Sequence, residues 1–297
     1  TGYRHLPCLP TADLTDLCAR ALAGGIETEF VQGLIRGHGL RPRGGALTGE
    51  YWPWPVKIHC LGEFSLYTDG KPVQFSRKAP KKVLALLKLL LALGGQGVPQ
   101  TAFMDALWPE EDADAAHRAF KTALFRLRQL LAHEVITLQK GAVSLQAECC
   151  WVDAWAFEQF LDEAGRLTET EQPAQAAEWS SKAALVYGGD FLAGEKAPWM
   201  SSVRARLQQR FVRAMHELGG DYHRQGRYQA AIECCQKGLQ VDGCAEQLYQ
   251  GLMQNYRLLG KKAEALAAYR RCKRLLSIAM NVQPSPATED MRRSLDS

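Results

Sequence analysis

Between residues 118 and 131 the apolar positions recur at the spacing of a helix. At about 100° per residue, one side of this segment is continuously apolar and carries Phe120, Leu124, Leu127 and Leu131. The opposite side carries long cations with a polar and an aromatic residue between them, namely Arg118, Lys121, Thr122, Phe125 and Arg128. The pattern predicts a helix that packs in a core with one face and presents a basic stripe with the other. A solvated helix with ordinary surface arginines is the alternative.

Phe125 favours a partner over plain solvent on that stripe. A large aromatic at the centre of a polar face exposes apolar area, which is unusual unless something covers it. A thymine methyl group or a sugar is one such cover. Arg126 falls at the edge of the stripe, where we expect it to contact a phosphate, and His117 stands beside Arg118 in a position to do the same.

The flanking segments alternate between short strands and helices. Strands are predicted at 57–61, 63–68 and 72–75, with a hairpin turn at Asp69-Gly70. Helices are predicted at 78–93, which Gly94-Gly95 ends, and at 99–107. An acidic turn at 110–112 then leads into the basic helix, with Asp112 or Asp114 as its N-cap. A closing hairpin is predicted from 135–138 and 143–145 around a turn at 139–141.

The last third of the chain repeats itself with an offset of 34 residues. The matched pairs are Leu218 and Leu252, Tyr222 and Tyr256, Gly226 and Gly260, Ala231 and Ala265, and Ile232 and Leu266. This spacing is typical of a two-helix repeat with a glycine in its turn and small residues where helices pack closely. An earlier helix pair is expected at 155–167 and 173–187, followed by a loop at 188–198. A short helix near 288–295 is expected to cap the last repeat, and the surface from Tyr222 to Arg274, with a basic end at 270–274, is expected to be concave.

The first 50 residues are less informative. Two short helices are expected at 14–23 and 28–36, followed by a linker at 37–45. The aromatic and proline residues at 51–55 are expected to pack this linker against the first strand, although a ligand-binding aromatic patch is the alternative. The expected domains are therefore 1–50, 51–148 and 149–297, and the fold class is mainly α with small β.

Charge is informative through its distribution and not through its sum. The 297 residues carry a net charge of only +4, with a pI near 8.5. Between Gly70 and Phe103, however, six cations and no acid occur, where phosphate contacts would lie; they are Lys71, Arg77, Lys78, Lys81, Lys82 and Lys88. Apolar runs are too short for a membrane span and there is no signal peptide, so we expect a cytoplasmic protein without a membrane partner.

Nothing in the sequence forms a catalytic or metal-binding motif. The nine cysteines include two adjacent pairs but no CxxC or paired Cys/His spacing, so we expect buried apolar thiols and neither metal nor disulfide. His216 and His223 are expected on repeat surfaces, and no histidine is paired with a nucleophile. There is no phosphate-cradling GxxxxGK motif. We therefore expect no cofactor and no enzymatic activity.

Residues 56–148 resemble a winged helix-turn-helix domain of the OmpR/PhoB type, as found in bacterial antibiotic-regulatory activators. The resemblance is carried by Arg118 at the start of the third helix, the Arg126-Leu127-Arg128 triplet near its end, the basic run 77–82 and the segment 106–109. Residues 149–297 resemble the bacterial transcriptional activation domain, which is related to tetratricopeptide repeats, and 188–192 match that family as well. Phe125 and Gln129 depart from the family pattern. Segments similar to 1–50 precede this pair of modules in large bacterial signal-transduction ATPases, which leaves open that the chain is the C-terminal part of such a regulator.

The resemblance implies a sequence-specific, DNA-binding transcriptional activator that uses tandem half-sites. The expected DNA-facing residues are His117, Arg118, Lys121, Thr122, Phe125, Arg126, Arg128, Lys140 on the wing, and Arg77, Lys78 and Lys81 at the first helix. Glu110 and Glu111 are expected to contact RNA polymerase. Further expected partners are a second copy through the repeats and an upstream sensor or ATPase region. The rival hypothesis is a scaffold without DNA, in which both modules serve protein contacts.

Overall fold

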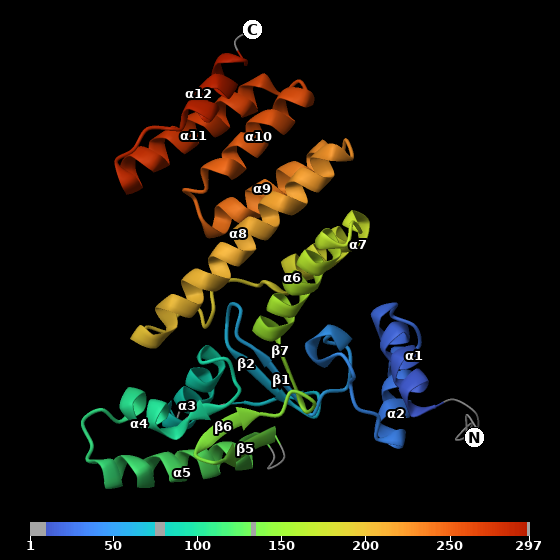
Figure 1. Ribbon diagram of the computed structural model, residues 1–297, viewed down its shortest axis with the longest axis vertical. Coiled ribbons are helices and arrows are strands. Elements are labelled where there is room, and N and C mark those ends of the chain that lie inside the picture. Colours follow the sequence, from blue (N-terminus) through green and yellow to red (C-terminus); the bar gives the residue numbers. More distant parts are fainter. Residues whose placement is uncertain (1–9, 75–80, 132–134, 296–297) are drawn as a thin grey trace. The chain divides into compact units, whose positions relative to one another are not determined.

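The chain folds into two compact units in the computed structural model (Figure 1). The structure describes residues 10–74, 81–131 and 135–295. The N-terminal unit contains the described residues up to Ala156 together with Leu192–Ser201, and the C-terminal unit contains Phe157–Phe191 and the described residues from Ser202 onward. Each unit is described by itself below.

The N-terminal unit begins with two helices that pack against each other. They are α1 (Thr11–Ala23) and α2 (Thr28–His38), which bury Leu14, Leu22 and Ile35, and they are followed by the 3₁₀ helix η1 (Gly45–Thr48). Both helices were predicted from the sequence. In the segment that follows, Trp52 and Trp54 are buried, and the Trp54 indole donates a hydrogen bond to the Gly49 carbonyl at 2.9 Å. This aromatic segment is thus part of the core, as the packing interpretation expected.

A four-stranded sheet follows, with the strand order β3-β2-β1-β7. Its strands are β1 (Val56–His59), β2 (Ser65–Thr68), β3 (Lys71–Pro72) and β7 (Cys150–Val152). The predicted turn at Asp69-Gly70 joins β2 to β3, and both residues have positive φ (48° and 76°). The strand β7, which was not predicted, runs parallel to β1. A domain boundary at 148 therefore separates β7 from the sheet to which it belongs.

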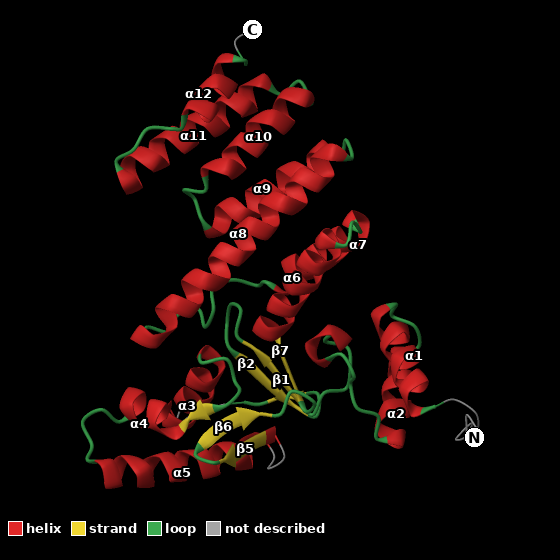
Figure 2. Ribbon diagram, viewed as in Figure 1, coloured by secondary structure: helices red, strands yellow, loops and turns green. Residues whose placement is uncertain are grey.

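Three further helices of the N-terminal unit form a core beside a small three-stranded sheet (Figure 2). The helices are α3 (Lys81–Ala92), α4 (Gln100–Leu107) and α5 (Ala113–Leu131), and the sheet has the order β4-β6-β5 from Val98–Pro99, Ala142–Leu145 and Ile136–Gln139. Phe103 and Phe120 are fully buried, with ring centroids 5.7 Å apart. This order of strands, three helices and hairpin confirms the winged helix-turn-helix fold.

A buried carboxylate ties the end of β1 to the start of α6 (Asp153–Glu169). Asp153 accepts hydrogen bonds from the backbone N–H groups of Cys60 and Leu61, each at 2.8 Å to Oδ2, and from the Cys60 thiol at 2.9 Å. Burial raises the pKa of this carboxyl, and the hydrogen bonds from Cys60 and Leu61 oppose that rise. The loop after Phe191 continues the same region, because Leu192 N donates to the Cys60 carbonyl and Ala193 N to the Gly62 carbonyl.

The C-terminal unit is an array of helix pairs (Figure 1). The boundary between the units falls within α6, and the 3₁₀ helix η3 (Pro198–Met200) belongs to the N-terminal unit. The further helices are α7 (Pro173–Val186), α8 (Ser201–Arg224), α9 (Tyr228–Val241), α10 (Glu246–Leu258), α11 (Lys262–Met280) and α12 (Pro286–Arg293).

The structure confirms the 34-residue repeat. Gly226 and Gly260 end the first helix of each pair with φ of 73° and 71°, and Ala231 and Ala265 are fully buried at the matching positions of α9 and α11. The helices of the two pairs also approach closely, because a Cβ added at Gly251 would lie 2.8 Å from the Cys235 sulfur. The helix pair α6–α7 and the capping helix α12 were predicted as well. Thr288 of α12 is fully buried and bonds to Glu246 of α10.

One histidine departs from its expected place on a repeat surface. His223 is half-buried, with Nδ1 2.9 Å from the Asn255 Oδ1 and Nε2 3.2 Å from the Gln254 amide nitrogen. The Asn255 amide donates to the Gly251 carbonyl, which leaves its oxygen to accept from the His223 ring. The ring therefore joins α8 to α10, whereas His216 is exposed as expected.

Candidate DNA-binding interface

The helix α5 is fixed at its start by a cap and along its length by the core. Asp112 is the N-cap: its Oδ1 accepts from the Ala115 N–H at 2.8 Å, and its carbonyl accepts from the Ala116 N–H at 2.8 Å. Of the two expected caps, Asp112 is thus the correct one. The predicted apolar stripe is buried in full, and its members Phe120, Leu124, Leu127 and Leu131 are at most 3% exposed. The opposite face of α5 is therefore held toward solvent by a rigid core.

Five of the predicted contact residues on α5 are exposed. They are Arg118, Lys121, Thr122, Phe125 and Arg126. Phe125 is 55% exposed, so its ring is available to a ligand on this face. The Thr122 hydroxyl donates to the Arg118 carbonyl at 2.9 Å, so its oxygen lone pairs remain available to accept from a ligand.

Two other predicted contact residues, His117 and Arg128, are half-buried and not fully exposed on this face. Arg128 keeps its Nε in the interior, without a hydrogen-bond partner within the described part of the chain. Its aliphatic stem is therefore partly withdrawn into the protein, which the helical projection did not show. His117 is half-buried in the second turn of α5.

A basic hollow of about 480 Å³ lies where α3, α4 and α5 meet. Its lining brings together four of the predicted residues, namely Lys81, Arg118, Thr122 and Arg126. Lys82, from the predicted cation run, and Trp108, which was not a predicted site residue, also line it. The Lys82 amino group bonds to the Leu107 carbonyl at the end of α4 and lies 5.4 Å from the centroid of the Trp108 ring. Lys82 thus caps α4, and the exposed cations beside it face the hollow.

The cation run between Gly70 and Phe103 is used differently from the expectation. Lys88 does not offer its charge to solvent: its side chain is only 13% exposed, pairs with Glu195 and lies 4.6 Å from the Phe64 ring centroid. Its role is to hold the 192–201 loop against α3, so the idea of a phosphate contact at Lys88 was wrong. Arg77 and Lys78 lie outside the described residues.

The turn of the closing hairpin has the tight geometry that its sequence predicted. Lys140 and Gly141 have φ of 50° and 76°, and Lys140 is exposed between β5 and β6. The Gly141 carbonyl accepts from the Gln100 N–H at 2.9 Å, which ties this wing to the start of α4. The wing is therefore anchored to the helical core at the residue next to Lys140.

The acidic turn between α4 and α5 contains one capping residue and two glutamates that cap nothing. Asp112 is occupied by the α5 N–H groups, whereas Glu110 and Glu111 are exposed and form no ion pair within the described ranges. The Glu111 N–H donates to the Trp108 carbonyl at 3.2 Å, which fixes the backbone of the turn. The two glutamates thus offer negative charge on a defined backbone.

The cysteines of the described chain are free, and six of the eight are buried. Burial raises the pKa of Cys235 to about 12 and, with the charge of Lys237 opposing it, that of Cys234 to about 11. The thiols are thus protonated and apolar in character. Within the described residues no group of three His, Cys, Asp or Glu side chains is placed to hold a metal ion, and no helix is long and apolar enough to cross a membrane.

Comparisons with known proteins agree with this architecture. The sequence profile of the bacterial transcriptional activator domain matches residues 152–295. The Regulatory protein DnrI of Streptomyces peucetius is 22% identical over 81% of this chain and 92% of its own length. Residues 152–295 thus form a bacterial transcriptional activator domain, and the chain as a whole is similar to bacterial regulatory proteins. Two longer relatives are the Regulatory proteins AfsR of Streptomyces griseus and Streptomyces coelicolor, each 25% identical to this chain. The matches cover 71% and 81% of this chain but only 22% and 24% of the two relatives, respectively.

A solved structure shares the fold. Mycobacterium tuberculosis EmbR, determined in complex with a low affinity phosphopeptide, superposes with a TM-score of 0.67 at 22% identity. The match covers 82% of this chain and 65% of EmbR. It supports the winged helix followed by a helical activator domain as the architecture of this chain.

Proposed function

We propose that this chain activates transcription by binding specific DNA sequences through α5. The observation that carries the proposal is the basic hollow, because residues from α3 and α5 meet there beside an exposed aromatic on the same helix face. Lys81, Arg118 and Arg126 supply positive charge, which a phosphate backbone matches. The match to the bacterial transcriptional activator domain and the similarity to bacterial regulatory proteins support the same assignment.

The exposed face of α5 divides into positioning and reading residues. In this proposal Lys121 and the cations of the hollow contact phosphates and fix the register, whereas Thr122 and Phe125 meet base edges in the major groove. The thymine methyl is the natural contact for the Phe125 ring. Lys140 reaches the adjacent minor groove from the wing, as basic turns of winged helices can.

Two further surfaces connect DNA binding to transcription. Glu110 and Glu111 contact RNA polymerase, since both are exposed on a fixed turn and neither pairs with a cation among the described residues. The C-terminal repeats join two protomers on tandem half-sites, because linkage raises the local concentration of the second winged helix. An upstream sensor or ATPase region is the proposed source of the signal, in keeping with the greater length of the AfsR relatives.

The experiment is a selection of genomic DNA by the purified full chain, followed by titration of the enriched site against random duplex. We expect an enriched site whose affinity exceeds that of random DNA by at least about 10³-fold and falls steeply with salt. An equal affinity for both duplexes, or none for either, would contradict the proposal and favour the protein scaffold.

A further inference from the structure

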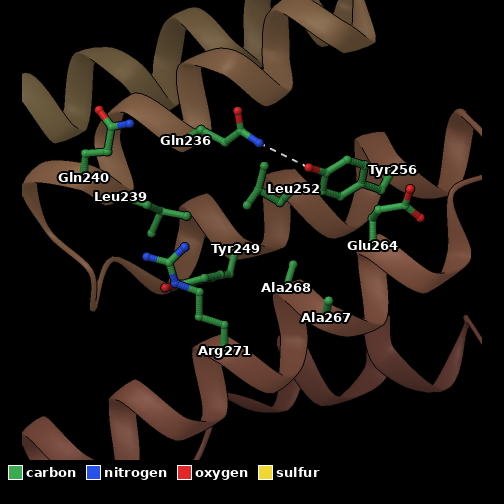
Figure 3. A pocket seen from close by; sticks show the side chains of 10 residues that line it. All are labelled: Gln236, Leu239, Gln240, Tyr249, Leu252, Tyr256, Glu264, Ala267, Ala268 and Arg271. Carbon is green, nitrogen blue, oxygen red and sulfur yellow. Dashed lines mark hydrogen bonds between the residues drawn. The ribbon is translucent and has the colours of Figure 1, made fainter.

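The repeats of the C-terminal unit contain a groove of about 410 Å³ between α9, α10 and α11 (Figure 3). Its volume falls within the range of about 300–1,000 Å³ that ligand sites occupy. The floor is apolar and closely packed, since Leu239, Tyr249, Leu252 and Ala268 are buried there. The groove lies wholly within this unit and is remote in sequence from α5.

The two ends of the groove carry opposite charges. Figure 3 shows Arg271 beside Tyr249 at one end, and Glu264 beside Tyr256 at the other, with Ala267 and Ala268 between them. Both Arg271 and Glu264 are exposed, and neither forms an ion pair within the described portion of the chain. Their charges are thus available to a ligand.

The spacing of these charges defines the ligand. Glu264 and Arg271 are separated by seven residues of α11, which is about 10 Å along a helix axis. An extended chain rises about 3.3 Å per residue and alternates its side chains between two faces, so two side chains four positions apart lie on one face about 13 Å apart. The long side chains of Arg271 and Glu264 can reach over the small difference between these two spacings. Ala267 leaves room between the charges for a main chain to approach the helix.

The opposite wall of the groove offers main-chain hydrogen bonds. Gln236 and Gln240 lie one turn apart on α9, and both are exposed toward the groove. A side-chain amide donates and accepts, as a peptide group does, so two amides in a row suit an extended backbone. Gln236 already donates to the Tyr256 hydroxyl at 3.2 Å, which holds its amide at the wall (Figure 3).

We infer that this groove binds an extended peptide segment of a partner protein, with an acidic and a basic residue four positions apart on the same face of the segment. The acidic residue pairs with Arg271 and the basic residue with Glu264. The inference does not depend on DNA binding.

The test uses the full chain and an array of octapeptides in which positions three and seven carry acid and base, base and acid, two acids, or two glutamines. The remaining positions are varied, and the best binders are titrated by fluorescence polarisation. We expect enrichment of the oppositely charged pairs. Arg271→Glu should weaken the best binder about tenfold or more, because it replaces an ion pair by a repulsion.

Two variants act as controls. Arg270→Glu changes the neighbouring exposed cation, which does not line the groove, and should leave the affinity within about twofold. The double variant Glu264→Arg with Arg271→Glu should prefer the reversed order of charges. Circular dichroism and thermal unfolding establish that each variant is folded.

Three outcomes would overturn the inference. One is an array without preference for oppositely charged pairs, and another is a preference that Arg271→Glu leaves unchanged. The third is loss of self-association in Arg271→Glu by sedimentation equilibrium without any peptide binding in the parent chain. That result would assign the groove to a second copy of this chain.

Discussion

Neutralising the hollow cations should change how DNA affinity depends on salt. Apart from Lys82, whose amino group caps α4, five cations of the described residues are exposed around α5 and the wing: Lys81, Arg118, Lys121, Arg126 and Lys140. If each meets one phosphate, log K falls with log salt with a slope of about −4.5, which is about a 500-fold loss between 50 and 200 mM. Replacing Arg118 and Arg126 by alanine removes two contacts. The slope should then be about −2.7, and the loss about 40-fold.

The assay is a salt titration of the full chain on its selected site by fluorescence anisotropy. Arg270→Ala is the matched control, because it removes an exposed arginine from the C-terminal unit and should leave the slope unchanged. A double variant that is folded and keeps the slope of the parent would refute the placement of these arginines on phosphates. It would also leave the hollow without its proposed role.

The remaining predictions concern the fold, the polymerase contact, the wing and alkaline pH. Asp153→Ala leaves the backbone N–H groups of Cys60, Leu61 and Ala154 without their acceptor and should lower the free energy of unfolding by about 3 kcal/mol in urea titrations; an unchanged value would contradict the role of Asp153. Glu110→Lys with Glu111→Lys should reduce transcription in vitro while operator affinity stays equal or rises, whereas a collapse of affinity would assign the turn to the fold. Lys140→Ala should lower the affinity for an operator duplex that extends beneath the wing. An equal loss on a duplex that ends before the wing would exclude the wing contact. Burial raises the pKa of Cys235 in the folded chain to about 12 from 9.0, so the thiol ionises first in the unfolded chain. The free energy of unfolding should therefore fall above pH 9, by up to about 1.4 kcal/mol per pH unit. In Cys235→Ala the free energy of unfolding should fall less steeply over this pH range.

The sequence predicted those parts of the structure that depend on local periodicity. The stripe of α5 and the repeat that relates Gly226 to Gly260 are written within one or two helices, so the spacing of apolar residues was sufficient. The Asp69-Gly70 turn was likewise predicted, because two positive φ angles suit those residue types.

The parts that were missed depend on contacts between distant residues. Asp153 binds Cys60 across 93 residues, and Lys88 binds Glu195 across 107. A single sequence shows neither pairing, so Lys88 looked like a free cation and β7 was not recognised as a partner of β1. Burial also depends on neighbours, which is why the helical projection placed Arg128 on the open face although its Nε is enclosed.

The most direct measurement of the central claim is a photo-crosslink from α5. Phe125→p-benzoylphenylalanine in the full chain places the reactive group at the centre of the exposed face, and the same replacement at Leu185, which is 81% exposed on α7, serves as the control. On the selected site we expect the label at position 125 to react with one or two bases of each half-site through the major groove. We expect no crosslink to a base from position 185. Crosslinks from position 125 that reach only protein, or that scatter over random DNA equally, would contradict the assignment of α5 as the helix that reads DNA.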